Sequence, residues 1–163
     1  MDTAKLIATL NSAGLKLAVA ESLTGGLLAS AFVSVPGASN VLLGAIVAYQ
    51  TSLKHELLGV ASGLLENQGA VDPEVAAQMA GGIRTRLAAK TGAAESQVIG
   101  VATTGVAGPD AQDGVAVGTV YIAISGPKIG EVVYAHQFEG TRDDIRNATV
   151  EAAIGHLGEA YLS

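Results

Sequence analysis

The sequence predicts an α/β domain in which helices cover both faces of a mixed, mainly parallel sheet of about five strands. Short apolar runs alternate with helical patterns over the first hundred residues. Two glycine-rich turns each follow such an apolar run, and a Gly-Pro turn joins the last two expected strands. A chain of 163 residues, 49% of them apolar, favours one domain over residues 1–163 with a substantial core.

The first part of the chain predicts three strands that pair in parallel. Strands are expected at 15–20, 41–49 and 97–103, helices at 2–13, 25–34, roughly 51–58 and 72–90, and a turn or helix near 62–67. Because helices separate these strands, we expect right-handed crossovers between them. The longest helix has a strong start, since Asp72 is a good cap, Pro73 suits the first turn and Glu74 complements the helix dipole.

The last third of the chain predicts a hairpin followed by a helix. Strands are expected at 115–125 and 131–139, and the turn at 125–130 makes them antiparallel. This turn contains the spacing S-x-x-K, which we interpret as an ordinary hairpin turn because Gly126-Pro127 cannot hold it on a helix. Thr141 is the expected cap of the final helix.

The composition excludes several classes of function. The net charge is −6, there is no basic run and no Trp, which argues against a nucleic-acid partner. The absence of Cys excludes disulfides, thiolate metal sites and cysteine catalysis, and fits a cytoplasmic protein. The apolar run at 41–49 is much shorter than the ~20 residues of a spanning helix, and the acidic start does not read as a signal peptide, so no membrane partner is expected.

The two glycine-rich turns predict the ligand site. Glu21-Ser22-Leu23-Thr24-Gly25-Gly26 follows the first strand, and Thr103-Thr104-Gly105-Val106-Ala107-Gly108-Pro109-Asp110 follows the third. Glycine permits tight turns and close approach to a ligand, and free N–H groups at a helix start attract anions. If the strands are parallel, both turns lie at the edge where open α/β sheets bind ligands.

Ser22 is the first candidate for chemistry. At a strand–turn–helix junction its hydroxyl is either a nucleophile facing backbone donors or a helix cap. The histidines His55, His136 and His156 lack companions that would suggest a catalytic triad. Lys54, just beyond Tyr49 at the end of the second strand, is either a surface residue or a desolvated base that takes the serine proton.

Two further features have both a functional and an ordinary interpretation. Asp110 and Asp113 flank the second turn, where they are either Mg²⁺ ligands or common turn residues, and no third carboxylate lies nearby in the sequence. Arg142 opposes the dipole at the start of the last helix, so it either faces an anionic ligand or lies on the surface.

Taken in order, several blocks resemble the CinA C-terminal domain family, which includes stand-alone nicotinamide-nucleotide amidases. The blocks are A-E-S-L-T-G-G at 20–26, V-P-G-A-S at 35–39, V-A-Y at 47–49 with Lys54, L-L-G-V at 57–60, G-V-A-G-P-D at 105–110, V-G-T-V at 117–120 and G-T-R at 140–142. The resemblance covers nearly the whole chain, and the first and fifth blocks together make it specific.

The resemblance implies a three-layer α/β/α sandwich and an activity. The activity is hydrolysis of the carboxamide of nicotinamide mononucleotide to nicotinate mononucleotide and ammonia. By position, Ser22 matches the family's nucleophile, and Lys54 and Tyr49 match the lysine and tyrosine that support it. No metal and no organic cofactor is implied.

The two turns and the start of the last helix are expected to bind the substrate, a small nucleotide. The expected contacts are Glu21, Thr24, Gly25, Gly26, Thr104, Gly105, Ala107, Gly108, Asp110 and Arg142. Backbone N–H groups of 22–26 or of 105–108 would hold the oxyanion. A homo-oligomer is expected, with a dimer favoured. The alternative functions are a catalytically silent nucleotide-binding or regulatory module and a Mg²⁺-dependent phosphate-ester or pyrophosphate hydrolase.

Overall fold

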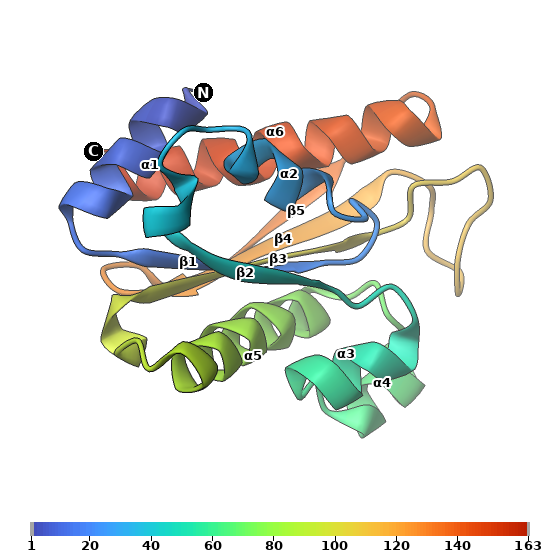
Figure 1. The fold of residues 1–163 in the computed structure, drawn as a ribbon. Coiled ribbons are helices and arrows are strands. Elements are labelled where there is room, and N and C mark those ends of the chain that lie inside the picture. Colours follow the sequence, from blue (N-terminus) through green and yellow to red (C-terminus); the bar gives the residue numbers. More distant parts are fainter. Residues whose placement is uncertain (1, 163) are drawn as a thin grey trace.

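A five-stranded sheet lies between two layers of helices in the computed structural model, which describes residues 2–162 (Figure 1). The strands are β1 (Lys16–Glu21), β2 (Leu42–Val47), β3 (Val98–Gly105), β4 (Thr119–Gly126) and β5 (Gly130–Gln137). Their order across the sheet is β2-β1-β3-β4-β5. Met1 and Ser163, the ends of the predicted domain, lie outside the described residues.

Helices cover both faces of this sheet, as predicted. One layer contains α1 (Thr3–Ser12), α2 (Leu27–Val33) and α6 (Arg142–Tyr161), and the other contains α3 (Thr51–Leu58), α4 (Ser62–Gln68) and α5 (Pro73–Thr91) (Figure 1). Two single 3₁₀ turns, Ala38–Asn40 and Glu95–Gln97, precede β2 and β3. Among residues 2–162, no helix is both long and apolar enough to cross a membrane.

The pairing confirms a mixed sheet and sets the limits of its parallel part. β1 pairs in parallel with β2 on one side and β3 on the other. β3 with β4 and β4 with β5 are antiparallel. The three strands that helices separate are therefore the parallel ones. Of the four strand pairings in the sheet, two are parallel and two are antiparallel.

The predicted strand at 115–125 begins later than expected. β4 starts at Thr119, because Gly118 adopts a φ of 87°, which breaks the extended conformation. Residues before Gly118 instead belong to a long loop that projects beyond the sheet (Figure 1). The Gly-Pro turn joins β4 and β5 as predicted, and Lys128 lies in that turn with a φ of 73°.

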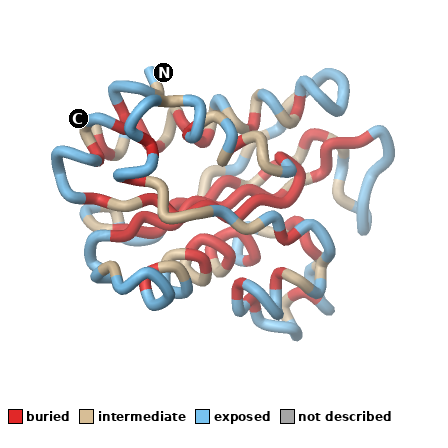
Figure 2. Tube along the Cα trace, viewed as in Figure 1, coloured by how far each residue is buried: buried red, intermediate tan, exposed pale blue. Residues whose placement is uncertain are grey.

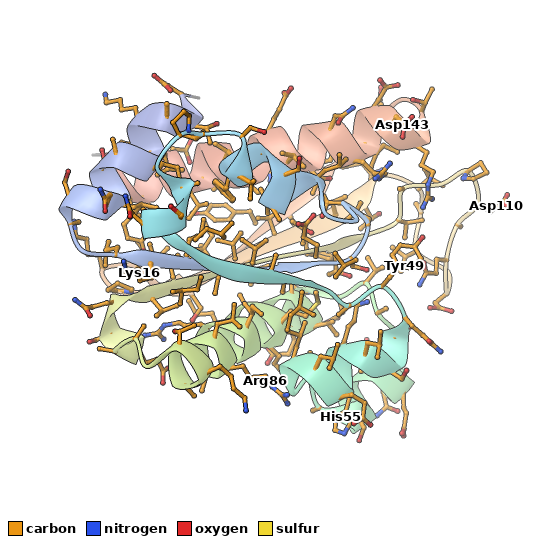
Figure 3. All side chains as sticks on the ribbon, viewed as in Figure 1. Lys16, Tyr49, His55, Arg86, Asp110 and Asp143 are labelled. Carbon is orange, nitrogen blue, oxygen red and sulfur yellow. The ribbon has the colours of Figure 1, made fainter. Side chains whose placement is uncertain are left out.

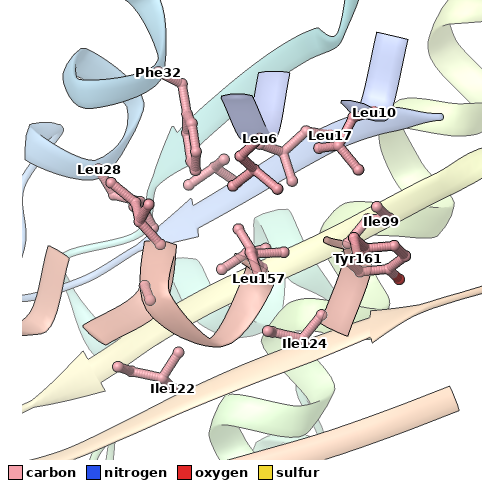
Figure 4. Close-up of a cluster of buried hydrophobic side chains, with 14 of the residues drawn as sticks. Leu6, Leu10, Leu17, Leu28, Phe32, Ile99, Ile122, Ile124, Leu157 and Tyr161 are labelled. Carbon is pink, nitrogen blue, oxygen red and sulfur yellow. The ribbon is translucent and has the colours of Figure 1, made fainter. Parts of the chain in front are cut away.

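The core forms two apolar layers, one on each face of the sheet. The layer beneath α1, α2 and α6 contains the larger side chains, including Leu6, Phe32, Ile99, Ile122 and Leu157 (Figure 4). The layer facing α3, α4 and α5 is rich in alanine and smaller residues. The central strands are buried over nearly their whole length (Figure 2). Continuous burial explains why β1 and β3 read as unbroken apolar runs.

Small residues let α5 pack closely against its neighbours. A Cβ on Gly82 would meet the Leu58 carbonyl oxygen at the end of α3 at 1.8 Å, so only glycine fits there. A Cβ on Gly100 of β3 would meet the Ala80 carbonyl oxygen of α5 at 2.1 Å. This close packing holds α3, which carries Lys54, against the α5 layer.

We predict that Gly82→Ala lowers the free energy of unfolding by about 1–3 kcal/mol, the usual cost of overpacking. The neighbouring Gly81 is a matched control, since a Cβ there meets only the tip of Glu131 at 4.0 Å. Gly81→Ala should stabilise the protein by about 0.5–1 kcal/mol through helix propensity. Urea titration of the two variants measures both effects, and equal stability would contradict the packing argument.

Candidate active site

The three parallel strands end at one edge of the sheet, as predicted, and main-chain hydrogen bonds extend their pairing into the turns. The Ser22 N–H donates to the Thr103 carbonyl over 3.0 Å. The Ala48 N–H donates to the Glu21 carbonyl over 2.9 Å. The ends of β1, β2 and β3 are thereby locked side by side, which brings both glycine-rich turns and the start of α3 together.

A cleft of about 380 Å³ opens at this edge, within the ~300–1,000 Å³ range of small-molecule sites. Nine of the thirteen expected site residues line it: Ser22, Tyr49, Lys54, Thr104, Gly105, Ala107, Gly108, Asp110 and Arg142. Further lining residues that the sequence analysis did not single out are Leu23, Gln50, Thr51, Ala70, Val71, Val106 and Gln112. Figure 3 shows Tyr49 at this end of the sheet and Asp110 on the projecting loop, with Lys16 at the opposite end.

Lys54 and Ser22 are in direct contact within the cleft. The Lys54 Nζ lies 3.1 Å from the Ser22 Oγ, and it donates to the Ala48 carbonyl over 2.8 Å and to the Tyr49 carbonyl over 3.4 Å. Helical side chains point back toward the helix start, so a lysine in α3 reaches the end of β2 that precedes it. Lys54 thus contacts the main chain of Ala48 and Tyr49 across the strand-to-helix turn.

Burial makes Lys54 a candidate base. Its side chain is fully buried, and within residues 2–162 it forms no ion pair. Removal from water disfavours the ammonium form and lowers the pKa of Lys54 from 10.5 to about 8. A substantial neutral fraction therefore exists near physiological pH, and a neutral amine beside a serine hydroxyl can accept its proton.

Tyr49 approaches Lys54 through its main chain and not through its hydroxyl. The Tyr49 hydroxyl instead accepts a hydrogen bond from Arg142 over 3.0 Å. Arg142 also donates to the Gly108 carbonyl over 2.6 Å, so its guanidinium bridges the end of β2 and the second glycine-rich turn. Arg142 therefore lines the cleft, although its side chain is also exposed to solvent. Among the described residues, no hydrogen bond joins the Tyr49 hydroxyl to Lys54, so a role for that hydroxyl as a proton relay or proton donor has no contact to support it.

Glu21 points away from the cleft. Its carboxylate is fully buried and accepts hydrogen bonds from the N–H groups of Gly26, Leu28 and Ala29, at 2.8–3.1 Å. These groups are the unpaired donors at the start of α2, where a negative charge is also favoured by the helix dipole. The expected substrate contact is thus a structural anchor, and it occupies the anion site that the sequence suggested for a ligand.

Thr24, Gly25 and Gly26 also lie outside the cleft lining. The Thr24 hydroxyl is buried and bonds to the Thr103 hydroxyl at 2.8 Å, which ties the two turns together. The two glycines have φ values of 59° and 99°, so they shape the turn that presents Ser22. This turn therefore contributes Ser22 and Leu23 to the cleft, and its remaining residues position them.

The second turn forms the opposite wall. The Thr104 hydroxyl donates to the Ala70 carbonyl over 2.6 Å, which holds the connection between α4 and α5 beside the cleft. Gly108 has a φ of 87°, and a Cβ there would meet Val117 at 2.8 Å, so glycine is required on both counts. The main-chain N–H groups of Ala107 and Gly108 have no hydrogen-bond partner among residues 2–162.

Arg146 of α6 is a positioning residue that the sequence analysis missed. Its guanidinium donates to the Leu23 carbonyl over 3.0 Å and to the Thr24 carbonyl over 3.3 Å. It also pairs with Asp143 at 3.1 Å. The contact joins residues far apart in the chain, so no local pattern signals it.

The remaining polar residues considered in the sequence analysis do not form a metal or catalytic cluster at the cleft. Asp110 lines the cleft, but Asp113 lies against Gly69. The described part of the chain contains no group of three or more His, Asp or Glu residues that could hold a metal ion. The histidines also lie outside the cleft lining, although His136 and His156 touch each other.

Comparison with known proteins decides the family. The model of the CinA C-terminal domain matches residues 2–161. The chain belongs to the CinA C-terminal domain family. A CinA-like protein of Frankia casuarinae is 47% identical over 138 residues, which cover 85% of this chain and 30% of that protein. The chain therefore spans about a third of the length of such CinA relatives.

Solved structures of competence/damage-inducible proteins of similar size share the fold. A competence/damage inducible protein from Agrobacterium tumefaciens matches with a TM-score of 0.86 and 31% identity, covering 98% of this chain and 96% of its own. A competence or damage-inducible protein from Enterobacter asburiae matches with a TM-score of 0.87 and 28% identity, covering 99% of both chains. These likenesses confirm the three-layer architecture with its mixed five-stranded sheet.

We predict that Glu21→Gln destabilises the fold by about 2 kcal/mol or more, because the amide group replaces a charged acceptor and leaves a buried N–H unpaired. Substrate affinity per folded molecule should change much less. Thermal unfolding and ligand titration of the same sample separate the two effects. A variant with the parent's melting temperature but no affinity for the substrate would indicate that Glu21 contacts the ligand after all.

Proposed function

We propose that this protein hydrolyses the carboxamide of nicotinamide mononucleotide to nicotinate mononucleotide and ammonia, with Ser22 as the nucleophile and Lys54 as the base. The observation that carries the proposal is the contact between the buried Lys54 Nζ and the Ser22 Oγ in the lining of the cleft. The choice of substrate follows from the resemblance of these motifs to the amidases of the CinA family.

The hydrogen bonds of Lys54 suit a neutral amine. The Ala48 and Tyr49 carbonyls take two N–H groups, and the third position faces the Ser22 hydroxyl. A neutral amine has two hydrogens and one lone pair, so its lone pair can receive the Ser22 proton. As the Ser22 Oγ attacks the carboxamide carbon, this proton passes to Lys54.

The remaining steps need the same two side chains. Lys54 returns the proton to the amide nitrogen, the C–N bond breaks, and ammonia leaves an ester on Ser22. Water then attacks this ester, with Lys54 taking one proton from the water and passing it to the departing Ser22 oxygen. The products are the carboxylate and regenerated enzyme, and the scheme requires no oxidant, metal or cofactor.

Main-chain donors are available for the oxyanion. The N–H groups of Leu23, Ala107 and Gly108 belong to cleft residues and have no partner among residues 2–162. Since Glu21 occupies the start of α2, these groups are the better candidates, and one such donor is typically worth about 3–4 kcal/mol of the barrier.

Arg142 supplies a positive charge for the phosphate of the nucleotide. Its guanidinium lines the cleft, and its bonds to Gly108 and Tyr49 use only part of its donor set. We assign Tyr49 the role of orienting Arg142 through its hydroxyl and Lys54 through its carbonyl. The exposed ring of Tyr49 also offers a wall for the pyridine ring.

The proposal is tested by identifying the products that form from nicotinamide mononucleotide in the presence of EDTA. We predict ammonia and nicotinate mononucleotide from the parent and a loss of several orders of magnitude with Ser22→Ala, because a nucleophile is removed. Ser52→Ala, which alters an exposed serine outside the cleft, is the control. Activity that needs Mg²⁺ and releases phosphate would favour the phosphate-ester or pyrophosphate hydrolase. Binding of the nucleotide without turnover would favour the catalytically silent module.

We predict that kcat/KM rises with pH and reaches half its plateau near the pKa of Lys54, about 8. The pKa lies below 10.5, so raising the pH through 8 increases the neutral, proton-accepting form. Lys54→Met should abolish turnover, whereas Lys90→Met, which alters an exposed lysine on α5, should keep the parent profile. A parent rate that is flat between pH 6 and 9 would place the base elsewhere.

A further inference from the structure

A second cluster of titratable side chains lies on the other side of the fold, between β5 and α6. His136 of β5 and His156 of α6 face each other, and their Nε2 atoms are 3.0 Å apart. The rings are tilted by 33° with centroids 5.1 Å apart. Neither residue lines the cleft, and His156 lies about 21 Å along α6 from Arg142 at 1.5 Å per residue.

Aromatic neighbours hold both imidazoles in place. Tyr134 stacks on His156 with centroids 3.7 Å apart and planes within 5°. Phe138 stacks on His136 with centroids 4.9 Å apart and planes within 9°. Residues 134 and 136 alternate along β5, and residue 138 follows directly after its last residue, so the three side chains share the face that meets α6. The convergence of the two Nε2 atoms is therefore built into the packing.

The protonation of the pair follows from a neighbouring carboxylate. His156 Nδ1 lies 3.2 Å from Glu159, and an ionised carboxylate only accepts hydrogen bonds, so Nδ1 carries the proton. In this tautomer the lone pair of His156 lies on Nε2, and the Nε2–H of His136 is the donor between the two rings. A carboxylate on the far nitrogen is the usual partner of a histidine that ligates a metal.

We propose that His136 and His156 bind a divalent transition metal ion, of the class of Zn²⁺, Ni²⁺ or Cu²⁺, between their Nε2 atoms. Two nitrogens on one tetrahedral Zn²⁺ lie about 3.3 Å apart, given Zn–N bonds of about 2.0–2.1 Å, and the pair is already close to this separation. On binding, the Nε2 proton of His136 moves to Nδ1 through solvent, which frees the second lone pair. Water completes the coordination shell.

The proposal concerns a site separate from the proposed amidase chemistry. It requires no residue of the cleft, and metal binding here leaves the Ser22–Lys54 contact untouched. Imidazole nitrogens favour Zn²⁺, Ni²⁺ and Cu²⁺ over Mg²⁺ or Ca²⁺, so ion selectivity is a further signature of the site.

The test is calorimetric titration of the protein, without a histidine tag and freed of chelator, with zinc chloride near neutral pH. We expect the parent protein to bind one zinc ion per chain. The His136→Ala and His156→Ala variants should each bind zinc at least tenfold more weakly than the parent. Glu159→Gln should weaken binding by about tenfold or more, as loss of such a partner typically does. His55→Ala is the matched control, because His55 lies on α3 and bonds to the Val60 carbonyl. Magnesium chloride should give no binding at this site.

Two results would overturn the proposal. One is parent-like zinc affinity in both alanine variants that replace the pair. The other is that the nitrogen NMR signals of the His136 and His156 Nε2 atoms in the parent protein do not change when zinc is added. This measurement uses the parent protein, so it does not depend on how the variants fold. Either result would leave the pair as a simple hydrogen bond between β5 and α6.

Discussion

Two main-chain hydrogen bonds beyond the end of β1 hold the site together. The Ser22 N–H bonds to the Thr103 carbonyl, and the Ala48 N–H bonds to the Glu21 carbonyl. They continue the parallel pairing into the turns, so the chain leaves three adjacent strands at one edge. The cleft depends on this alignment, since Ser22, Lys54 and the second turn follow three different strands, β1, β2 and β3.

The edge contains two buried charged side chains whose surroundings differ in kind. Glu21 accepts three main-chain N–H bonds at the start of α2, which give both of its carboxylate oxygens a partner. Lys54 meets only carbonyl and hydroxyl oxygens and no carboxylate. No negative charge therefore offsets the loss of water around the Lys54 ammonium group, and burial lowers the pKa of Lys54. The same edge of the sheet thus holds one side chain charged for structure and leaves another poised for proton transfer.

The start of α6 completes the site from the antiparallel side of the fold. Arg142 lies in the first turn of α6, where the helix dipole disfavours cations, yet Asp143 and Asp144 lie in the same turn, and Asp144 forms a capping box with Thr141. Arg146 follows this turn and pairs with Asp143. Both arginines donate to carbonyls of the glycine-rich turns.

The sequence by itself determined the elements, the parallel pairing of the first three strands and the edge at which the turns meet. Apolar runs, helix caps and glycines act over a few residues, so they can be read locally. Family motifs also pointed to Ser22 and Lys54, and the structure places these side chains in contact. Only the tertiary structure decided that Glu21 anchors α2, that the Tyr49 hydroxyl serves Arg142, and that Arg146 and the His136–His156 pair have partners. Those contacts join residues distant in the chain, and the direction of a side chain at a turn depends on which donors and acceptors the folded neighbours bring to it.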